Sequence, residues 1–226
     1  MHLRSPRANR IFSRLTIIKW WWATTNHGIL KRVIDLTAVM SALLVLSPLF
    51  LIVAVLIKAY DRGPILFWQY RVGKYGSLFM FPKFRSMRVD AEEVRAKLLE
   101  TNQHGAGGVT FKMKNDPRVT PIGRFIRRFS IDELPQLWCI LRGDMSLVGP
   151  RPPIIGEVDR YSMRDRARLE VTPGLTSIWA VSGRSEIPFE QQVEMDIEYI
   201  QTKSIGNDVK LLVKTVPAVI KGKGAY

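Results

Sequence analysis

The hydrophobic pattern of the chain is dominated by one uncharged run, from Leu36 to Ile57. As an α-helix this run is about 33 Å long, enough to cross the hydrocarbon core of a bilayer. It starts too far from the N-terminus and is too long for a cleaved signal peptide, and no small-residue cleavage site follows it. The pattern therefore predicts a helix embedded in a membrane.

Two residues at the centre of the run, Ser47 and Pro48, predict a break. Proline has no N–H and clashes with the preceding turn, so the helix should kink there, and the Ser47 hydroxyl can bond the carbonyl that is left free. Basic residues flank both ends of the run, and the positive-inside rule is satisfied if both ends are cytoplasmic. We therefore favour a re-entrant helix-break-helix that enters one leaflet and returns. A kinked membrane-spanning helix is the alternative.

The segment before the apolar run also carries membrane signals. Asp35 lies at the mouth of the run, where a carboxylate is costly unless it is paired, and Lys31 and Arg32 are the nearest candidate partners at helical spacing. Further upstream, the Trp-rich segment 15–22 suits the headgroup region of a membrane. The alternative for this segment is a tail that only touches lipid.

The remaining pattern predicts a mostly helical α+β fold. Two aromatic-rich segments, 65–71 and 78–85, flank a Gly-containing turn and predict a β-hairpin. Several of the expected helices have an apolar and a basic face, as interfacial helices do. The expected helices are 90–100, 121–129, 137–141, 189–202 and the apolar segment 209–220, which Pro217 should interrupt, and a mobile Gly-rich loop is expected at 102–108.

Charge narrows the class of partner. The chain has 34 Lys and Arg against 20 Asp and Glu, for a formal net charge of +14, so its partner should be anionic: nucleic acid, acidic lipid or a phosphorylated substrate. A single cysteine, Cys139, excludes an internal disulfide framework and a Cys-rich zinc site. The three scattered histidines argue against a His-built metal site. A metal would have to bind carboxylate and phosphate oxygens, which favours a hard ion such as Mg²⁺.

The acidic doublet Asp132 and Glu133 has two interpretations. In the first, Ser130 and Glu133 form a capping box at the start of a helix. In the second, Pro135 opens the helix, so that the doublet lies near the positive end of the helix dipole, where bound phosphate is favoured. A divalent cation bridging to a diphosphate would then balance the two charges. One carboxylate could bind the metal while the other attacks phosphorus.

Candidate phosphate-binding cations surround the doublet in the sequence. Arg127 precedes it, and Arg151 follows it in a Pro-Arg-Pro-Pro segment, where a rigid loop would present a planar guanidinium to phosphate. The alternative for that segment is a stiff surface turn. Lys83, Arg85 and Arg184 are further candidates, with a solvated surface position as the alternative for each.

Taken together, these motifs resemble those of bacterial sugar transferases of the monotopic phosphoglycosyl transferase superfamily. The resemblance covers about residues 28–226, in the order found in the family. The matching motifs are Lys31-Arg32-x-x-Asp35, Ser47-Pro48, Lys83-Phe84-Arg85-Ser86-Met87, Arg127, Ser130-x-Asp132-Glu133-Leu134-Pro135-Gln136, Gly143-Asp144-Met145-Ser146-x-Val148-Gly149-Pro150-Arg151-Pro152, Pro173-Gly174-Leu175-Thr176, Gly183-Arg184 and the C-terminal Gly-x-Gly-Ala-Tyr at 222–226.

The resemblance implies an enzyme that moves a sugar-1-phosphate from a UDP-sugar to a polyprenyl phosphate, such as undecaprenyl phosphate, with release of UMP and with Mg²⁺ as cofactor. It implies that Asp132 is the nucleophile of a ping-pong reaction through a covalent phospho-sugar ester, and that Glu133 binds the metal. Arg127 and Arg151 would hold phosphate oxygens, with Lys83 assisting. The C-terminal motif looks like that of the exopolysaccharide branch, in which glucose or galactose is the expected sugar.

The same resemblance implies a monotopic protein on the cytoplasmic face of the bacterial inner membrane. Residues 1–27 would form a basic, Trp-rich tail, 28–60 the re-entrant membrane helix, and 61–226 a catalytic domain in contact with membrane lipids. The chain leaves no room for a multi-span N-terminal module, so the small form of the family is expected. The interfacial helices could support a homodimer.

Three positions depart from the family pattern. The family usually has a basic residue where this chain has Thr172, a Gly where it has Ser177, and a Gln where it has Ala180. These departures affect the expected sugar specificity more than the reaction. Two other classes of function stay open at this stage. A non-catalytic membrane-anchored scaffold would tolerate replacement of Asp132, and a nucleic-acid-binding protein would suit the charge but leaves the apolar run unexplained.

Overall fold

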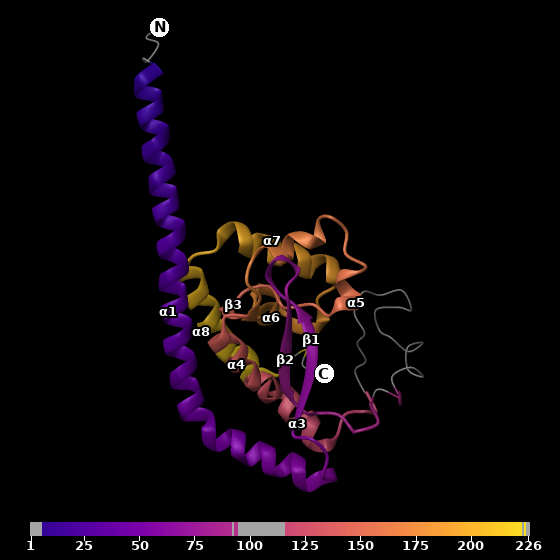
Figure 1. The fold of residues 1–226 in the computed structure, drawn as a ribbon. Coiled ribbons are helices and arrows are strands. Elements are labelled where there is room, and N and C mark those ends of the chain that lie inside the picture. Colours follow the sequence, from indigo (N-terminus) through magenta and orange to yellow (C-terminus); the bar gives the residue numbers. More distant parts are fainter. Residues whose placement is uncertain (1–5, 92, 95–115, 223, 225–226) are drawn as a thin grey trace.

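The computed structural model describes residues 6–91, 93–94, 116–222 and 224, without the side chains of residues 6–27. A single long helix, α1 (Pro6–Asp61), runs along one side of a domain built from all the later elements (Figure 1). Its part Gly28–Asp61 has a mean hydropathy of 2.8 and is the one helix in the described chain that is long and apolar enough to cross a membrane. Helical structure begins at Pro6, so α1 continues across the expected boundary between residues 27 and 28.

The predicted break at Ser47 and Pro48 is a bend within α1. Figure 1 shows the helix turning sharply near its C-terminal end, and Pro48 is the proline in its interior. Ser47 Oγ donates a hydrogen bond to the Leu44 carbonyl at 2.9 Å. That carbonyl is the acceptor that an N–H at position 48 would have used, so the serine replaces the bond that proline removes. Around the bend, Leu44 and Val45 are 78% and 74% exposed.

The predicted hairpin is confirmed by strands β1 (Leu66–Val72) and β2 (Leu78–Phe84), which pair antiparallel around the short helix η1 (Lys74–Gly76). Side chains alternate between the two faces of a strand, and Phe79 and Phe81 are buried on the inner face of β2. Lys83 follows in the same alternation, with its ammonium 5.4 Å from the centre of the Phe81 ring. The hairpin therefore points a lysine toward the interior.

The next elements confirm two predicted helices. α3 (Pro121–Arg128) begins at Thr120, whose hydroxyl accepts a hydrogen bond from Gly123 N at 2.8 Å. The short helix η3 (Ile131–Gln136) leads into α4 (Leu137–Arg142), which ends at Gly143 in the left-handed conformation. The helix predicted at 90–100 and the loop predicted at 102–108 lie wholly or largely outside the described residues.

The C-terminal half adds a small parallel sheet that the hydrophobic pattern does not predict. Strand β3 (Ser146–Val148) pairs with β4 (Gly174–Thr176). The short elements around them are α5 (Ile155–Val158), η4 (Asp165–Glu170), α6 (Ile178–Ser182) and η5 (Arg184–Glu186). These strands and helices are too short to produce a readable period in the sequence.

Two longer helices complete the chain. α7 (Phe189–Thr202) has the predicted bounds. α8 (Ile205–Lys221) continues through Pro217, so the interruption expected there is wrong. Pro217 and Val213 are both exposed, and water can therefore bond the Val213 carbonyl that the proline leaves without a donor.

The core shows how α1 is attached on both sides of its bend. Before the bend, Val39 joins the main apolar cluster, which contains Phe81 and Ile140. After the bend, Val53 and Ile57 join a second cluster with Phe84 and Ile126. Both parts of α1 therefore pack on the same domain.

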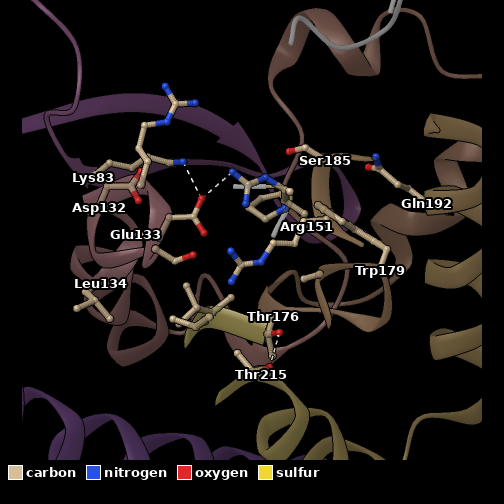
Figure 2. A pocket seen from close by; sticks show the side chains of 18 of the residues that line it. Lys83, Asp132, Glu133, Leu134, Arg151, Thr176, Trp179, Ser185, Gln192 and Thr215 are labelled. Carbon is tan, nitrogen blue, oxygen red and sulfur yellow. Dashed lines mark hydrogen bonds and ion pairs between the residues drawn. The ribbon is translucent and has the colours of Figure 1, made fainter. Parts of the chain in front are cut away.

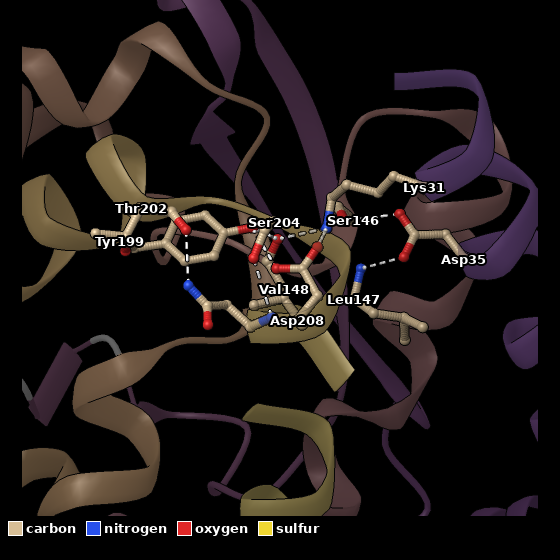
Figure 3. A network of polar contacts seen from close by, with 10 residues as sticks. Lys31, Asp35, Ser146, Leu147, Val148, Tyr199, Thr202, Ser204 and Asp208 are labelled. Carbon is tan, nitrogen blue, oxygen red and sulfur yellow. Dashed lines mark hydrogen bonds and ion pairs between the residues drawn. The ribbon is translucent and has the colours of Figure 1, made fainter. Parts of the chain in front are cut away.

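A polar network, here called the docking network, adds to this attachment (Figure 3). Asp35 accepts hydrogen bonds from Ser146 Oγ at 2.7 Å and from Leu147 N at 3.3 Å. Lys31 forms an ion pair with Asp208 of α8. These contacts correct the expected pairing of Asp35 with Lys31 and Arg32, because the folded domain brings closer partners to each group.

Arg32 also takes part in the docking network. It donates to the Leu141 carbonyl at 2.8 Å and to the Ile140 carbonyl. These two carbonyls lie at the C-terminal end of α4, where a helix has few N–H groups of its own to pair them, although Gly143 N also donates to the Ile140 carbonyl at 3.1 Å. The guanidinium therefore acts as a cap supplied by another helix.

Candidate active site

A cavity of about 520 Å³ lies between the hairpin, η3, and the helices of the C-terminal half. It is called the cationic cavity here because seven cationic and four anionic side chains line it: Arg71, Lys83, Arg118, Arg127, Arg151, Arg168 and Arg184, with Asp116, Asp132, Glu133 and Glu157. Figure 2 shows Lys83 and the acidic doublet at one side, Arg151 facing Glu133, and Thr176 and Thr215 at another end. The surplus of cationic side chains in its lining suits an anionic ligand.

The acidic doublet lies in the first turn of η3, and the capping-box interpretation is wrong. Ser130 precedes this turn with φ +54°, a left-handed conformation that is rare for a residue with a side chain, and its hydroxyl makes no capping bond. The Glu133 carboxylate does not reach back to the Ser130 amide. It turns instead toward the cationic cavity.

Glu133 is the centre of an ion-pair triad. Its Oε1 accepts a hydrogen bond from Lys83 Nζ at 2.8 Å and another from Arg151 Nη2 at 2.9 Å (Figure 2). Burial opposes its ionisation, but the charges of Arg151 and Lys83 outweigh this effect and hold the pKa of Glu133 below its usual value. Glu133 is therefore an anion at neutral pH.

Asp132 has a different environment, although it is the adjacent residue. Asp132 is only 7% exposed, and within the described part of the chain no group donates a hydrogen bond to its carboxylate. Burial raises the pKa of Asp132 to about 6, opposed by the charge of Lys83 and assisted by that of Glu133. A buried carboxylate that lacks donors retains more of its basicity than one that is paired.

The loop that carries Arg151 is held by buried backbone, so it is not a surface turn. Pro152 and Pro153 are buried, and their carbonyls accept hydrogen bonds from Arg71 Nη1 at 3.2 Å and Val72 N at 2.9 Å. At the start of the loop, a Cβ on Gly174 would lie 2.0 Å from the nitrogen of Gly149. The two backbones can cross there only because Gly174 has no side chain, and this crossing directs Arg151 into the cavity.

Two of the predicted arginines have guanidinium atoms without a partner. Nη1 of Arg127, at the end of α3, and Nη1 of Arg184, in η5, are buried and find no hydrogen-bond partner among the described residues. Both residues line the cationic cavity. Because an unpaired buried donor is costly, such atoms favour a bound acceptor.

Arg85 is the predicted cation that the structure places elsewhere. It forms a two-point ion pair with Asp61 at the end of α1, with Nη1 2.6 Å from Oδ2, and its Nε donates to the Pro64 carbonyl at 2.6 Å. β2 ends at Phe84, so the alternation that directs Lys83 inward does not extend to Arg85. Arg85 therefore holds the end of α1 to the hairpin and does not line the cationic cavity.

Several lining residues were missed by the sequence reasoning. Arg71 faces Phe79 across the hairpin and places its guanidinium 5.0 Å from the centre of the Phe81 ring. Directly opposite residues share one face of a hairpin, so the register could have revealed this arginine. Thr176 and Thr215, hydrogen-bonded at 2.8 Å, come from β4 and α8, and no local signal brings them together.

Of the three departures from the family pattern, Ala180 lines the cationic cavity. Ser177 caps α6 by accepting a hydrogen bond from Ala180 N at 3.2 Å, and Thr172 does not line the cavity. Cys139 is buried, and burial raises the pKa of its thiol to about 12. The cysteine packs in the core and is a poor nucleophile.

The donor set of the doublet suits a hard cation. Carboxylate oxygens are the ligands that Mg²⁺ prefers, and this ion usually keeps waters and phosphate oxygens as its other ligands. Within the described part of the chain, no group of three or more His, Cys, Asp and Glu side chains gathers to hold a metal by itself. An ion here would therefore bind Asp132 or Glu133 together with a ligand's phosphate.

The chain is similar in sequence to several known proteins. Residues 26–222 match the profile of a family described as bacterial sugar transferase. The chain is 45% identical over 201 residues to the galactosyl transferase CpsE of Streptococcus agalactiae. This match covers 88% of this chain and 44% of that protein. It is 39% identical over 201 residues to the exopolysaccharide production protein ExoY of Rhizobium meliloti, covering 88% and 89% of the two chains.

A third relative is the undecaprenyl-phosphate galactose phosphotransferase of Salmonella typhimurium, 41% identical over 206 residues. The match covers 90% of this chain and 43% of that protein. The chain thus spans less than half the length of CpsE and of the Salmonella protein, and most of the length of ExoY.

Proposed function

The chain belongs to the bacterial sugar transferase family, and we propose that it transfers a hexose-1-phosphate from a UDP-sugar to undecaprenyl phosphate and releases UMP. The names of the relatives support galactose or glucose as the hexose and exopolysaccharide assembly as the setting. The observation that carries the proposal is the contrast within the doublet: Glu133 is held by two cations, whereas buried Asp132 is left without a donor.

In this proposal Asp132 is the nucleophile. Its carboxylate oxygen bonds to the β-phosphorus of the UDP-sugar, the bond from that phosphorus to the bridging oxygen breaks, and UMP leaves with that oxygen. A phosphate oxygen of undecaprenyl phosphate then attacks the same phosphorus. The Asp132–phosphorus bond breaks, which restores the carboxylate and yields the diphosphate-linked sugar.

The cations of the cavity serve the phosphates. Arg151 and Lys83 lie on the side of the doublet and would hold oxygens that gain charge as the bonds exchange. Arg127 and Arg184 each offer an unpartnered guanidinium atom, which can bind the diphosphate without first breaking another bond. Mg²⁺, bound through Glu133 and phosphate oxygens, would supply Lewis-acid neutralisation of charge on the leaving group.

The attachment of α1 supports a re-entrant topology. Asp35 and Ile57 both contact the one domain, which lies on one side of a membrane. From Asp35 to the bend, and from the bend to Asp61, each arm of the helix is about 20 Å long, less than the thickness of the hydrocarbon core. The exposed apolar residues around Ser47 and Pro48 would then lie in one leaflet, and the domain on the cytoplasmic face of the inner membrane.

The decisive experiment incubates the purified full chain with UDP-galactose or UDP-glucose and Mg²⁺, without lipid. We expect one UMP per protein molecule in a single burst, and the mass of a hexose phosphate on the peptide that contains Asp132. Undecaprenyl phosphate added afterwards should discharge the adduct and start steady turnover.

Two other outcomes would change the assignment. UMP that appears only when lipid is present would contradict the covalent intermediate but keep the transfer reaction. No UMP from any UDP-sugar would favour a membrane-anchored scaffold, and salt-sensitive binding of RNA or DNA would favour a nucleic-acid-binding role.

A further inference from the structure

The C-terminal turn after α8 reaches the wall of the cationic cavity. Gly222 and Gly224 have φ +62° and +70°, left-handed values that glycine adopts without strain. Gly224 lines the cavity, and its carbonyl accepts a hydrogen bond from Ser185 N at 3.4 Å. The turn therefore contacts η5, the element that carries Arg184.

The fit between the turn and η5 leaves no space for a side chain. A Cβ on Gly224 would lie 2.6 Å from the Gly183 carbonyl oxygen and 3.2 Å from the Cβ of Arg184. The first distance is shorter than two such atoms can approach, and the carbonyl belongs to backbone, which cannot rotate away. Any residue larger than glycine at position 224 must therefore separate the turn from the backbone next to Arg184.

Arg184 is held in an unusual state. Its backbone has φ +54°, and its Nη1 is buried without a partner among the described residues. Burial lowers the pKa of this guanidinium, while Glu133 and Asp132 act in the opposite direction, so its charge lies within reach of the doublet. A left-handed backbone and an unpaired buried donor persist only where neighbouring structure holds them.

The same turn contacts a second arginine segment. A Cβ on Gly222 would lie 2.8 Å from Cγ of Arg128, the residue after Arg127. The turn thus touches the segments that carry the unpartnered guanidinium atoms of Arg127 and Arg184.

We propose that the C-terminal turn around Gly222 and Gly224 is a positioning element that holds Arg184 in the orientation that binds the diphosphate of the substrate. The proposal rests on the proposed function for the identity of that substrate. Gly224 acts through Arg184 and does not touch the ligand.

The test compares Gly224→Ala with Gly206→Ala, a matched control. Gly206 lies in the first turn of the same helix α8, and a Cβ there meets nothing within 4 Å. Gly224→Ala should raise the KM for UDP-glucose or UDP-galactose, and the Kd for UDP measured by calorimetry, by about tenfold, with kcat changed less than about threefold. Gly206→Ala should change neither constant.

A double-mutant cycle separates positioning from general damage. In an Arg184→Ala background, adding Gly224→Ala should weaken UDP binding by less than about twofold, because its effect passes through the arginine. If the two effects multiply, or if Gly224→Ala leaves UDP binding unchanged, the proposal is wrong. Should Gly224→Ala not fold, a chain that ends at Gly222 is compared in the same cycle with the same expected outcomes.

Measuring UDP binding also distinguishes failure of the positioning role from failure of the proposed function. If the wild-type chain releases no UMP from any UDP-sugar but binds UDP or inorganic pyrophosphate, the transferase assignment fails and the cycle still tests the turn with that ligand. If the wild-type chain binds neither ligand, the positioning role is overturned as well.

Discussion

The docking network and the cationic cavity are both built from charged side chains, but they differ in how completely those charges are paired. In the docking network, Lys31 meets Asp208, and Asp35 accepts two hydrogen bonds from β3. In the cationic cavity, Arg127 and Arg184 keep unpartnered guanidinium atoms, and Asp132 has no donor in the described structure.

This difference indicates which cluster serves the fold and which serves a ligand. A buried polar group that is left unpaired costs about 1–3 kcal/mol, so a network that only joins two elements should pair its members. The cavity does not, and two of the four non-glycine residues with positive φ in the described chain, Ser130 and Arg184, lie in its wall. Unpaired groups and backbone strain together mark a site completed by something that binds.

The largest expected effect comes from Asp132→Asn. Loss of the nucleophile should lower the rate of UMP release by about a thousandfold or more. Because the pKa of Asp132 in the folded protein lies above its ordinary value, its ionisation at neutral pH disfavours the folded state. The neutral amide should therefore raise the free energy of unfolding by about 1–3 kcal/mol, measured by denaturation in detergent.

Asp144→Asn is the control for that substitution, because Asp144 pairs with Arg142 and does not line the cavity. It should keep UMP release near the wild-type rate. An Asp132→Asn variant that is less stable and still active would reverse the contrast between the two clusters.

Asp35→Ala should lower the stability of the fold and leave catalysis nearly unchanged, the opposite of Asp132→Asn. It removes the acceptor for Ser146 Oγ and Leu147 N, and should lower the free energy of unfolding by about 2–3 kcal/mol. UMP release per folded molecule should change by less than about fivefold, because the Asp35 carboxylate does not line the cationic cavity. Asp90→Ala, which breaks an exposed ion pair with Arg88, should cost less than about 0.5 kcal/mol in the same assay. A loss of catalysis in folded Asp35→Ala would show that the network belongs to the site.

The smallest effect is the dependence of kcat/KM on pH. Burial raises the pKa of Asp132 to about 6, so protonation removes the nucleophile as the pH falls through that value. We expect kcat/KM for the UDP-sugar to fall about tenfold per unit below pH 6. An aspartate with the ordinary pKa of 3.8 would leave kcat/KM nearly unchanged down to about pH 5. A flat profile down to pH 5 would contradict the raised pKa.

Local patterns predicted the elements well where they were long or carried a turn signal. The hairpin, α7 and the bend at Ser47 and Pro48 follow from alternation, helical period and proline chemistry acting over a few residues. The β3–β4 pair was not predicted, because its three-residue strands lie far apart in the chain and are joined by pairing alone.

In the candidate site, too, local patterns predicted some features, whereas others depend on contacts between distant residues. The doublet, Lys83, Arg127, Arg151 and Arg184 were all expected, and all line one cavity. Arg85 was expected there and is absent from the lining, since Asp61 binds it. Partner choice depends on which charges the fold brings within about 3 Å, and this information is not local.

The amino-acid sequence by itself determined the long apolar helix, its bend at a proline, the acidic doublet and the surplus of cations, because each depends on residue type and short spacing. The tertiary structure alone decided that Glu133 is paired while Asp132 is not, that Asp35 joins α1 to β3, and that Gly224 lies against Arg184. These outcomes depend on contacts between residues distant in the chain, where burial and the nearest opposite charge set both the pKa and the orientation of a side chain.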